Sequence, residues 1–157
     1  MQPTSAETIN KWKETIEKVP FNAFVGIQVL VVESGRSKCK LTFRSDLGNH
    51  VGTMHAAAQY SLIEAASGAV LIGSFAELQG QATPLAVGAD IAYRSPAHGD
   101  CTADATLDPE DIELAKSELV ANRKARVNVR VNLADSKGTI STEATVHWYI
   151  RMHPPQK

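Results

Sequence analysis

The sequence predicts an α+β domain in which a curled antiparallel sheet wraps around one long central helix. First, residues 54–76 form one long apolar segment that carries a single charge, at Glu64. Second, two segments before it and four after it have the residue pattern of strands, and short turns between strands favour antiparallel pairing. Third, a sheet with one polar face must cover its other face, and residues 54–76 are the only segment apolar enough.

An N-terminal helix is predicted within residues 1–20. Thr4 or Ser5 can act as its N-cap, and Pro20 ends it. Apolar residues recur inside it at helical spacing, at Ile9, Trp12, Ile16 and Val19.

The remaining elements follow from apolar alternation and from turn residues. A strand over residues 24–32 is followed by a turn at Gly35 and a second strand over residues 38–43. Residues 44–53 have the composition of a loop and lead into the central helix at 54–76. Later strands are expected over residues 85–93, 101–107, 127–133 and 140–150, with a short helical turn after Pro109 and a tail at 152–157. Residues 1–157 therefore read as one domain.

Composition excludes several classes of partner. The chain has 157 residues, 43% of them hydrophobic and 21% charged, with a net charge of −1. This balance favours neither nucleic acid nor an anionic membrane. Residues 54–76 are long enough to span a bilayer, but Glu64 and several serines favour a buried helix in a cytoplasmic protein. Cys39 and Cys101 are expected to be buried free thiols.

Glu64 stands alone as a charge between Ala56 and Ala76. Burying a carboxylate without a partner is unfavourable, so such a group needs partners or a raised pKa. It lies either on a narrow solvated face of the helix or at a functional site. Its apolar neighbours Leu62, Ile63 and Ala65 favour a site.

Two motifs carry a resemblance to a known family. Residues 52–64, G-T-M-H-A-A-A-Q-Y-S-L-I-E, resemble the signature of hotdog-fold acyl-CoA thioesterases of the phenylacetyl-CoA thioesterase type. Asn49, His55 and Glu64 keep the intervals of that signature. Residues 89–97, A-D-I-A-Y-R-S-P-A, resemble the next strand of the family and its Ser-Pro-Ala ending. The resemblance covers roughly residues 24–149 and implies a hotdog fold and thioester hydrolysis.

The chemistry of thioester hydrolysis suits these positions. Negative charge develops on the carbonyl oxygen, and the free N–H groups at a helix start can stabilise it, here from Ala56 or its neighbour. Glu64 would act as general base on water or as nucleophile. Asn49 would orient the water or the thioester, and His55 would open the helix and hold the loop or the carbonyl. Neither a metal nor a cofactor is required, because coenzyme A belongs to the substrate.

The spacing within the helix predicts a shared site. Glu64 follows Ala56 by eight residues, which is about 12 Å along a helix axis. A carboxylate at that distance cannot act on a carbonyl at its own helix start. Two such helices packed antiparallel about a two-fold axis would bring Glu64 of one subunit to the helix start of the other. We therefore expect a homodimer or a dimer of dimers, with Gly68 and Gly73 available for close helix packing.

Candidate substrate-binding residues lie both inside the two motifs and beyond them. Tyr60 could line an acyl pocket, and Ser95 closes the second motif. Coenzyme A needs cations for its phosphates, and the family places the nucleotide near the ends of these strands. The candidate cations are Arg94, Arg123, Lys124 and Arg126, each of which could instead belong to an ordinary polar sheet face.

Departures from the family keep other functions open. Ala56-Ala57 replaces the usual Gly-Gly, and Ala86 stands where many relatives have Ser or Thr. One alternative is an acyl-CoA or fatty-acyl binding domain without catalysis. Another is a hotdog dehydratase, although the chain has no Pro-Gly loop with a histidine before the central helix.

Overall fold

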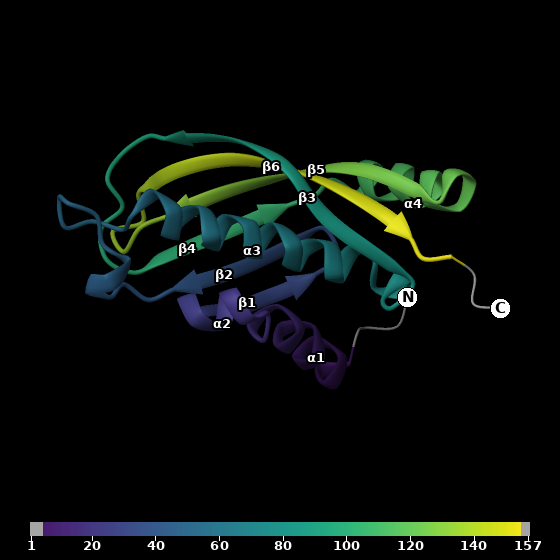
Figure 1. Ribbon diagram of the computed structural model, residues 1–157, viewed down its shortest axis with the longest axis horizontal. Helices are drawn as coiled ribbons and strands as arrows, with labels where there is room; N and C mark the ends of the chain where they lie inside the picture. The colour runs from purple at the N-terminus through teal and green to yellow at the C-terminus, as the bar shows by residue number, and fades with distance from the viewer. Residues whose placement is uncertain (1–4, 155–157) are drawn as a thin grey trace.

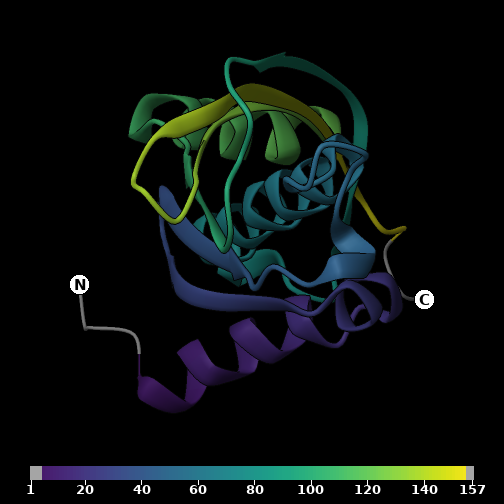
Figure 2. The same ribbon diagram turned by 90° about the vertical axis from the view of Figure 1, so that its left-hand side faces the viewer.

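The computed structural model describes residues 5–154 and has the predicted hotdog arrangement, a curled sheet around one helix (Figures 1 and 2). The sheet has six strands in the order β1-β2-β4-β5-β6-β3, and every neighbouring pair is antiparallel. The strands are β1 (Ile27–Glu33), β2 (Arg36–Leu41), β3 (Ala82–Tyr93), β4 (Cys101–Thr106), β5 (Lys124–Ala134) and β6 (Ile140–Met152).

The central helix α3 (Ala56–Ser74) fills the concave side of the sheet. Strand β5 shows why, because its buried residues Val127, Val129, Val131 and Leu133 alternate with exposed polar ones. Period-two alternation directs one row of side chains toward α3 and the other toward solvent. None of the helices in residues 5–154 is both long and apolar enough to cross a membrane.

The N-terminal region contains two helices where one was predicted. Ser5 is the N-cap of helix α1 (Ala6–Glu17), and its hydroxyl accepts the backbone N–H of Thr8 at 3.2 Å. Pro20 ends this helix region as expected but also opens a second helix, α2 (Pro20–Val25), because proline is favoured at a first helical position. Gly26, with φ of 90°, ends α2. The first strand consequently starts at Ile27, and the prediction that it starts at Phe24 is wrong.

The segment after Pro109 is a full helix, α4 (Pro109–Asn122), and the prediction of a short turn is wrong. Its polar composition conceals a narrow apolar stripe of Ile112, Ala115 and Leu119, all buried. Spacings of three and four residues place these side chains on one face. Packing of that stripe supplies the stability that the local sequence lacks.

Three polar side chains fix α3 against the sheet. The buried amide of Gln59 accepts the Thr142 hydroxyl of β6 at 2.5 Å. The Ser67 hydroxyl accepts the indole N–H of Trp148 at 3.0 Å. From the other side, the Ser37 hydroxyl of β2 donates to a backbone carbonyl in the middle of α3 at 2.6 Å. These directional bonds determine which face of the helix stays open.

The two glycines of α3 have different surroundings. A Cβ at Gly73 would overlap the backbone of Glu33 in β1, so this position needs glycine for contact with its own sheet. The expectation that Gly73 serves a contact between two central helices is therefore wrong. A Cβ at Gly68 would lie 3.5 Å from Trp148 and 3.8 Å from Ile16, which are ordinary contact distances.

This difference predicts opposite effects of alanine. Gly73→Ala should lower the free energy of unfolding by about 1–3 kcal/mol, because the added methyl overlaps backbone that cannot move freely. Gly68→Ala should raise it by up to about 1 kcal/mol, because alanine is the better helix former and the methyl fits. Urea denaturation at matched protein concentration measures both. Equal effects of the two substitutions would contradict this packing.

Candidate active site

The start of α3 is capped by His55. The ring Nδ1 of His55 accepts the backbone N–H of Ala57 at 3.0 Å. The backbone N–H of His55 donates to the Leu47 carbonyl at 2.8 Å. Because Nδ1 is an acceptor, the neutral ring carries its proton on Nε2. His55 thus opens the helix and ties it to the preceding loop.

The N–H of Ala56 is free at this helix start. No acceptor within residues 5–154 bonds it, and Ala56 is exposed. The aligned peptide dipoles of a long helix give its N-terminus partial positive charge, which favours a developing oxyanion. The Tyr93 hydroxyl donates to the Ala56 carbonyl at 3.3 Å and so joins β3 to the same point. Tyr93 lies inside the second sequence motif, residues 89–97, but the sequence assigned it no role.

An open hollow of about 390 Å³ lies in front of this helix start. It brings together four of the predicted site residues, which come from the loop before α3, from its first residue and from the segment after β3. They are Asn49, Ala56, Arg94 and Ser95.

Asn49 uses most of its side chain to close the loop before the helix. Its Oδ1 accepts the N–H groups of Val51 at 3.1 Å and Thr53 at 3.0 Å, and its Nδ2 donates to the Thr53 hydroxyl at 2.9 Å. One amide hydrogen is left for a ligand. Asn49 therefore shapes the rim of the hollow, and its predicted role toward water depends on that single hydrogen.

Arg94 and Ser95 differ in how they are satisfied. The Arg94 guanidinium pairs with Glu143 at 2.8 Å. Among the described residues, the Ser95 hydroxyl is the one buried side-chain oxygen without a hydrogen-bond partner. An unpartnered buried hydroxyl is unfavourable, and a polar ligand in the hollow would satisfy it.

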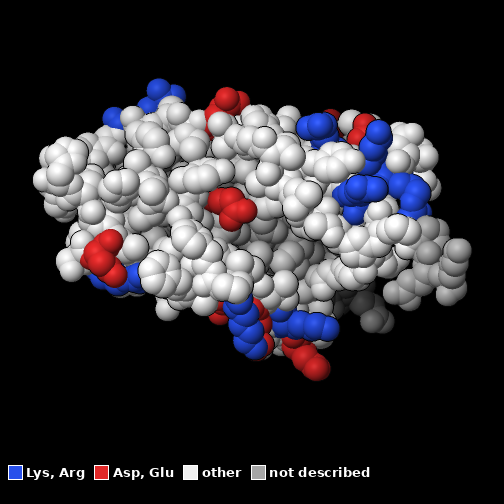
Figure 3. Space-filling view, in the orientation of Figure 1, with Lys and Arg blue, Asp and Glu red and all other residues white. Residues whose placement is uncertain are grey.

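Glu64 lies on a narrow strip of α3 that stays partly open, between β3 on one side and α1 and α2 on the other (Figures 1 and 2). We call this the open strip; its residues recur every three or four positions and are Ala57, Ser61, Glu64, Gly68 and Ile72. Figure 3 shows that the face over α3 is largely uncharged, with one isolated acidic group near its centre.

The Glu64 carboxylate has no hydrogen bond and no ion pair within residues 5–154. Burial raises its pKa above the ordinary value of a carboxyl group. Glu64 is thus neither a solvated surface charge nor a member of a structural ion pair. A carboxylate of this kind takes up a proton more readily than an ordinary one does, as a general base must.

Tyr60 is partly buried and packs against the hydrophobic core one turn into α3. Burial raises the pKa of the Tyr93 phenol, and the neighbouring Tyr60 adds to the effect. The two phenols therefore lie near each other beside the helix start. Ala86, where relatives have Ser or Thr, is exposed next to an irregularity in the pairing of β3 with β6.

Apart from Arg94, the predicted phosphate-binding cations lie away from the start of α3. Lys124 and Arg126 line a separate hollow of about 440 Å³ at the start of β5, where the Arg126 guanidinium lies 5.4 Å from the centre of the Tyr149 ring. The Arg123 guanidinium donates to the His153 carbonyl. This end of the molecule, where Figure 3 shows several basic side chains together, is opposite the start of α3 (Figure 1). One chain therefore does not bring these residues to the helix start.

Neither cysteine is placed for chemistry. Cys39 and Cys101 are free and fully buried, as predicted. Burial raises the pKa of each thiol to about 12, which keeps both protonated and unreactive. Within residues 5–154, no group of three or more His, Cys, Asp or Glu residues is arranged to hold a metal ion.

Comparison with known proteins places the chain in a family. The family model described as "Domain of unknown function (DUF4442)" matches residues 12–150. The chain belongs to this family. Comparison with curated proteins finds no match.

Solved structures with the same fold include proteins described as thioesterases. A Pseudomonas aeruginosa protein of unknown function, described as a "Probable Thioesterase", is 26% identical, with a TM-score of 0.81 over 97% of this chain and 99% of its own. The phenylacetic acid degradation protein PaaI of Thermus thermophilus is 19% identical, with a TM-score of 0.63 over 85% and 99%. A thioesterase of Staphylococcus aureus is 17% identical, with a TM-score of 0.66 over the same shares. The predicted resemblance to hotdog-fold thioesterases is confirmed.

The raised pKa of Glu64 predicts a pH-dependent effect on stability. A carboxyl whose pKa is raised on folding stabilises the protein below its unfolded value, about 4.3, and that contribution is lost as pH rises through the folded value. Glu64→Gln should therefore raise the Tm relative to wild type at pH 7.5 and lose this advantage near pH 4. Thermal melts at both pH values measure it.

Asp108→Asn is the matched control, because a hydrogen bond from Arg130 lowers the pKa of Asp108. This substitution should have the opposite sign and lower the Tm at pH 7.5. A Glu64→Gln protein that is less stable than wild type at neutral pH would show that the carboxylate is stabilised rather than strained.

Proposed function

We propose that this protein hydrolyses acyl-CoA thioesters at a site shared by two copies of the chain. The observation that carries the proposal is the unpaired, partly buried Glu64 on the open strip, with a raised pKa. The free N–H of Ala56 supplies the complementary group, about 12 Å away along the same helix. Relatives of the same fold that are described as thioesterases support this reaction class.

The reaction follows from these two groups. The thioester carbonyl accepts a hydrogen bond from the Ala56 N–H of one subunit, and Glu64 of the other takes a proton from a water molecule whose oxygen attacks the carbonyl carbon. The tetrahedral intermediate collapses, the C–S bond breaks, and the proton on Glu64 passes to the departing thiolate. Alternatively, the carboxylate attacks directly and forms an anhydride, which water then cleaves. The products are the same in both routes.

The exposed edge of the sheet supports a dimer. Within residues 5–154, β3 pairs only with β6, and Leu85 and Val87 on β3 are 53% and 52% exposed. A long apolar edge strand is prone to pair with another strand. The open strip lies beside this edge, and α2 adds the exposed Phe21 and Phe24 on its other side. A second copy would cover an edge and a face that are otherwise unusually apolar.

Antiparallel pairing of two β3 strands about a two-fold axis would set the two α3 helices antiparallel. The start of one α3 then faces Glu64 of the other. In the same arrangement, the start of β5 in one subunit, with Lys124 and Arg126, comes close to the start of α3 in the other. We propose that these two residues, with Arg94, bind the phosphates of coenzyme A.

Thiol release from a panel of acyl-CoA esters tests the proposal. Glu64→Gln should lower kcat by about 10²–10⁴-fold through loss of the base. Ala56→Pro should lower it by about 10²–10³-fold through loss of one oxyanion donor. Proline fits this first helical position, because the preceding His55 has φ of −62° and ψ of 142°.

Glu77→Gln is the control, because Glu77 is exposed and pairs with Lys116 near the far end of the helix. Equal rates for wild type and Glu64→Gln would refute the catalytic proposal. Binding of acyl-CoA without turnover by the wild type would favour the binding-domain alternative, in which Ala56-Ala57 replaces the usual Gly-Gly.

A further inference from the structure

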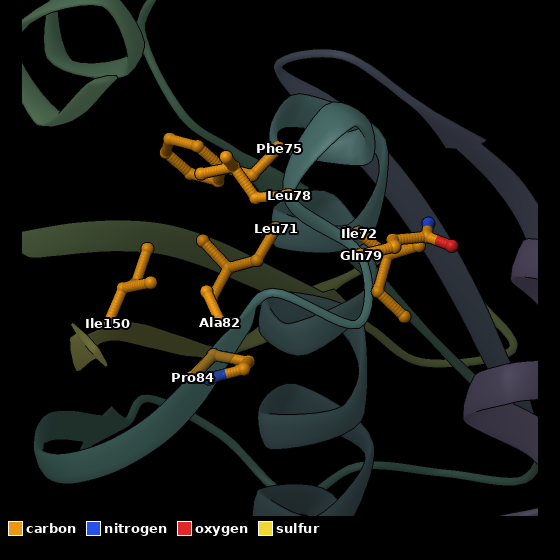
Figure 4. Close-up of a pocket in the computed structure, with 8 residues that line it drawn as sticks. All are labelled: Leu71, Ile72, Phe75, Leu78, Gln79, Ala82, Pro84 and Ile150. Atoms are coloured by element: carbon orange, nitrogen blue, oxygen red, sulfur yellow. The ribbon is translucent and has the colours of Figure 1, made fainter. Parts of the chain in front are cut away.

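An apolar cavity lies at the C-terminal end of α3, away from the reacting groups. Its volume is about 80 Å³, and Figure 4 shows side chains from α3, β3 and β6 around it. Except for Gln79, the side chains that line it are hydrocarbon, among them Leu71, Ile72, Phe75, Ala82, Pro84 and Ile150. The hydrolytic mechanism uses none of them.

The open strip leads from Glu64 to this cavity. Glu64, Gly68 and Ile72 follow at four-residue intervals, and Ile72 itself lines the cavity. Residues at such intervals lie above one another on one face of a helix. Gly68 has no side chain to interrupt the path, and the nearest side chains around it are those of Trp148 and Ile16. No charged residue stands between Glu64 and the cavity along α3.

In the proposed dimer, the two α3 helices overlap only between Ala56 and Glu64. This step depends on the proposed function, in which the partner's α3 begins beside Glu64 and runs toward the start of this chain's α3. The residues beyond Glu64, from Gly68 to Ile72, then have no partner helix above them. An apolar path that starts at the reacting carboxylate and ends in a hydrocarbon cavity suits the acyl part of a thioester.

We infer that the strip from Glu64 to Ile72 and the apolar cavity bind the straight acyl chain of the substrate. Ile72 follows Glu64 by eight positions, which is about 12 Å along the helix axis. A staggered carbon chain with bonds of about 1.5 Å advances roughly 1.3 Å per carbon, so about nine or ten carbons reach the cavity. The preferred substrates are therefore medium or long straight-chain acyl-CoA esters, and short or rigid aromatic esters leave the cavity empty.

Chain-length kinetics test this inference. For straight-chain acyl-CoA esters of two to sixteen carbons, kcat/KM should rise toward about ten carbons, by roughly fourfold for each methylene that becomes buried, and then level off. Phenylacetyl-CoA should be a poorer substrate than decanoyl-CoA. A flat profile, or a maximum at two to four carbons, would overturn the inference and leave thioester hydrolysis intact.

Substitutions along the path provide a second readout. Gly68→Leu would obstruct the strip, and Ala82→Phe would fill the cavity. Each should lower the ratio of kcat/KM for decanoyl-CoA to kcat/KM for butyryl-CoA by at least tenfold. Val120→Leu, on the exposed surface of α4, should leave it unchanged. An unchanged ratio in both obstructing variants would overturn the inference.

Binding to the Glu64→Gln variant separates this inference from the proposed function. Calorimetric titration with decanoyl-CoA and butyryl-CoA measures affinity without turnover. The acyl site is supported if Glu64→Gln binds decanoyl-CoA far more tightly than butyryl-CoA and if adding Gly68→Leu removes that difference in affinity. If the wild type at the same time releases no thiol from either ester, the hydrolase proposal fails while the acyl site stands. Equal affinity for the two esters would overturn the acyl site.

Discussion

The rotation of α3 about its own axis is fixed by buried polar bonds to the sheet, and the open strip depends on that rotation. Gln59 and Ser67 bind β6 through Thr142 and Trp148, and Ser37 holds the helix from β2. In an apolar interior such bonds are directional, whereas hydrophobic contacts alone would tolerate several rotations. A rotation of the helix by one residue would turn the Glu64 carboxylate toward the apolar inner face of the sheet.

In the proposed function, one chain holds both halves of the hydrolytic site but cannot bring them together. The free N–H of Ala56 and the carboxylate of Glu64 belong to one rigid helix, about 12 Å apart along its axis. Under that proposal, the rigidity of the helix means that the reaction needs a second subunit. The apolar edge of β3 and the uncharged face around the open strip offer the surface for it. On this account, assembly and catalysis depend on the same face of the molecule.

The sequence predicted the sheet well, because buried and exposed residues alternate strictly along strands such as β5. It also marked Glu64, since a lone charge in an apolar helix is visible without coordinates. It missed α4, whose stability comes from the packing of three side chains, and α2, because Pro20 both ended and began a helix. The hydrogen bond between Gln59 and Thr142 is a tertiary contact that no local pattern encodes. Asn49 closes its own loop through local bonds to Val51 and Thr53, which its expected role toward the substrate did not include.

Subunit complementation tests the shared site most directly. Ala56→Pro removes the N–H and Glu64→Gln removes the carboxylate, so each variant alone should be nearly inactive. A mixed dimer regains one complete site, with Glu64 from the first variant and the Ala56 N–H from the second. Unfolding and refolding equal amounts together should therefore restore about a quarter of wild-type thiol release, since half of the randomly formed dimers are mixed and each has one working site of two. No recovery in mixed dimers, shown to form by differential tagging, would contradict a site built from two chains.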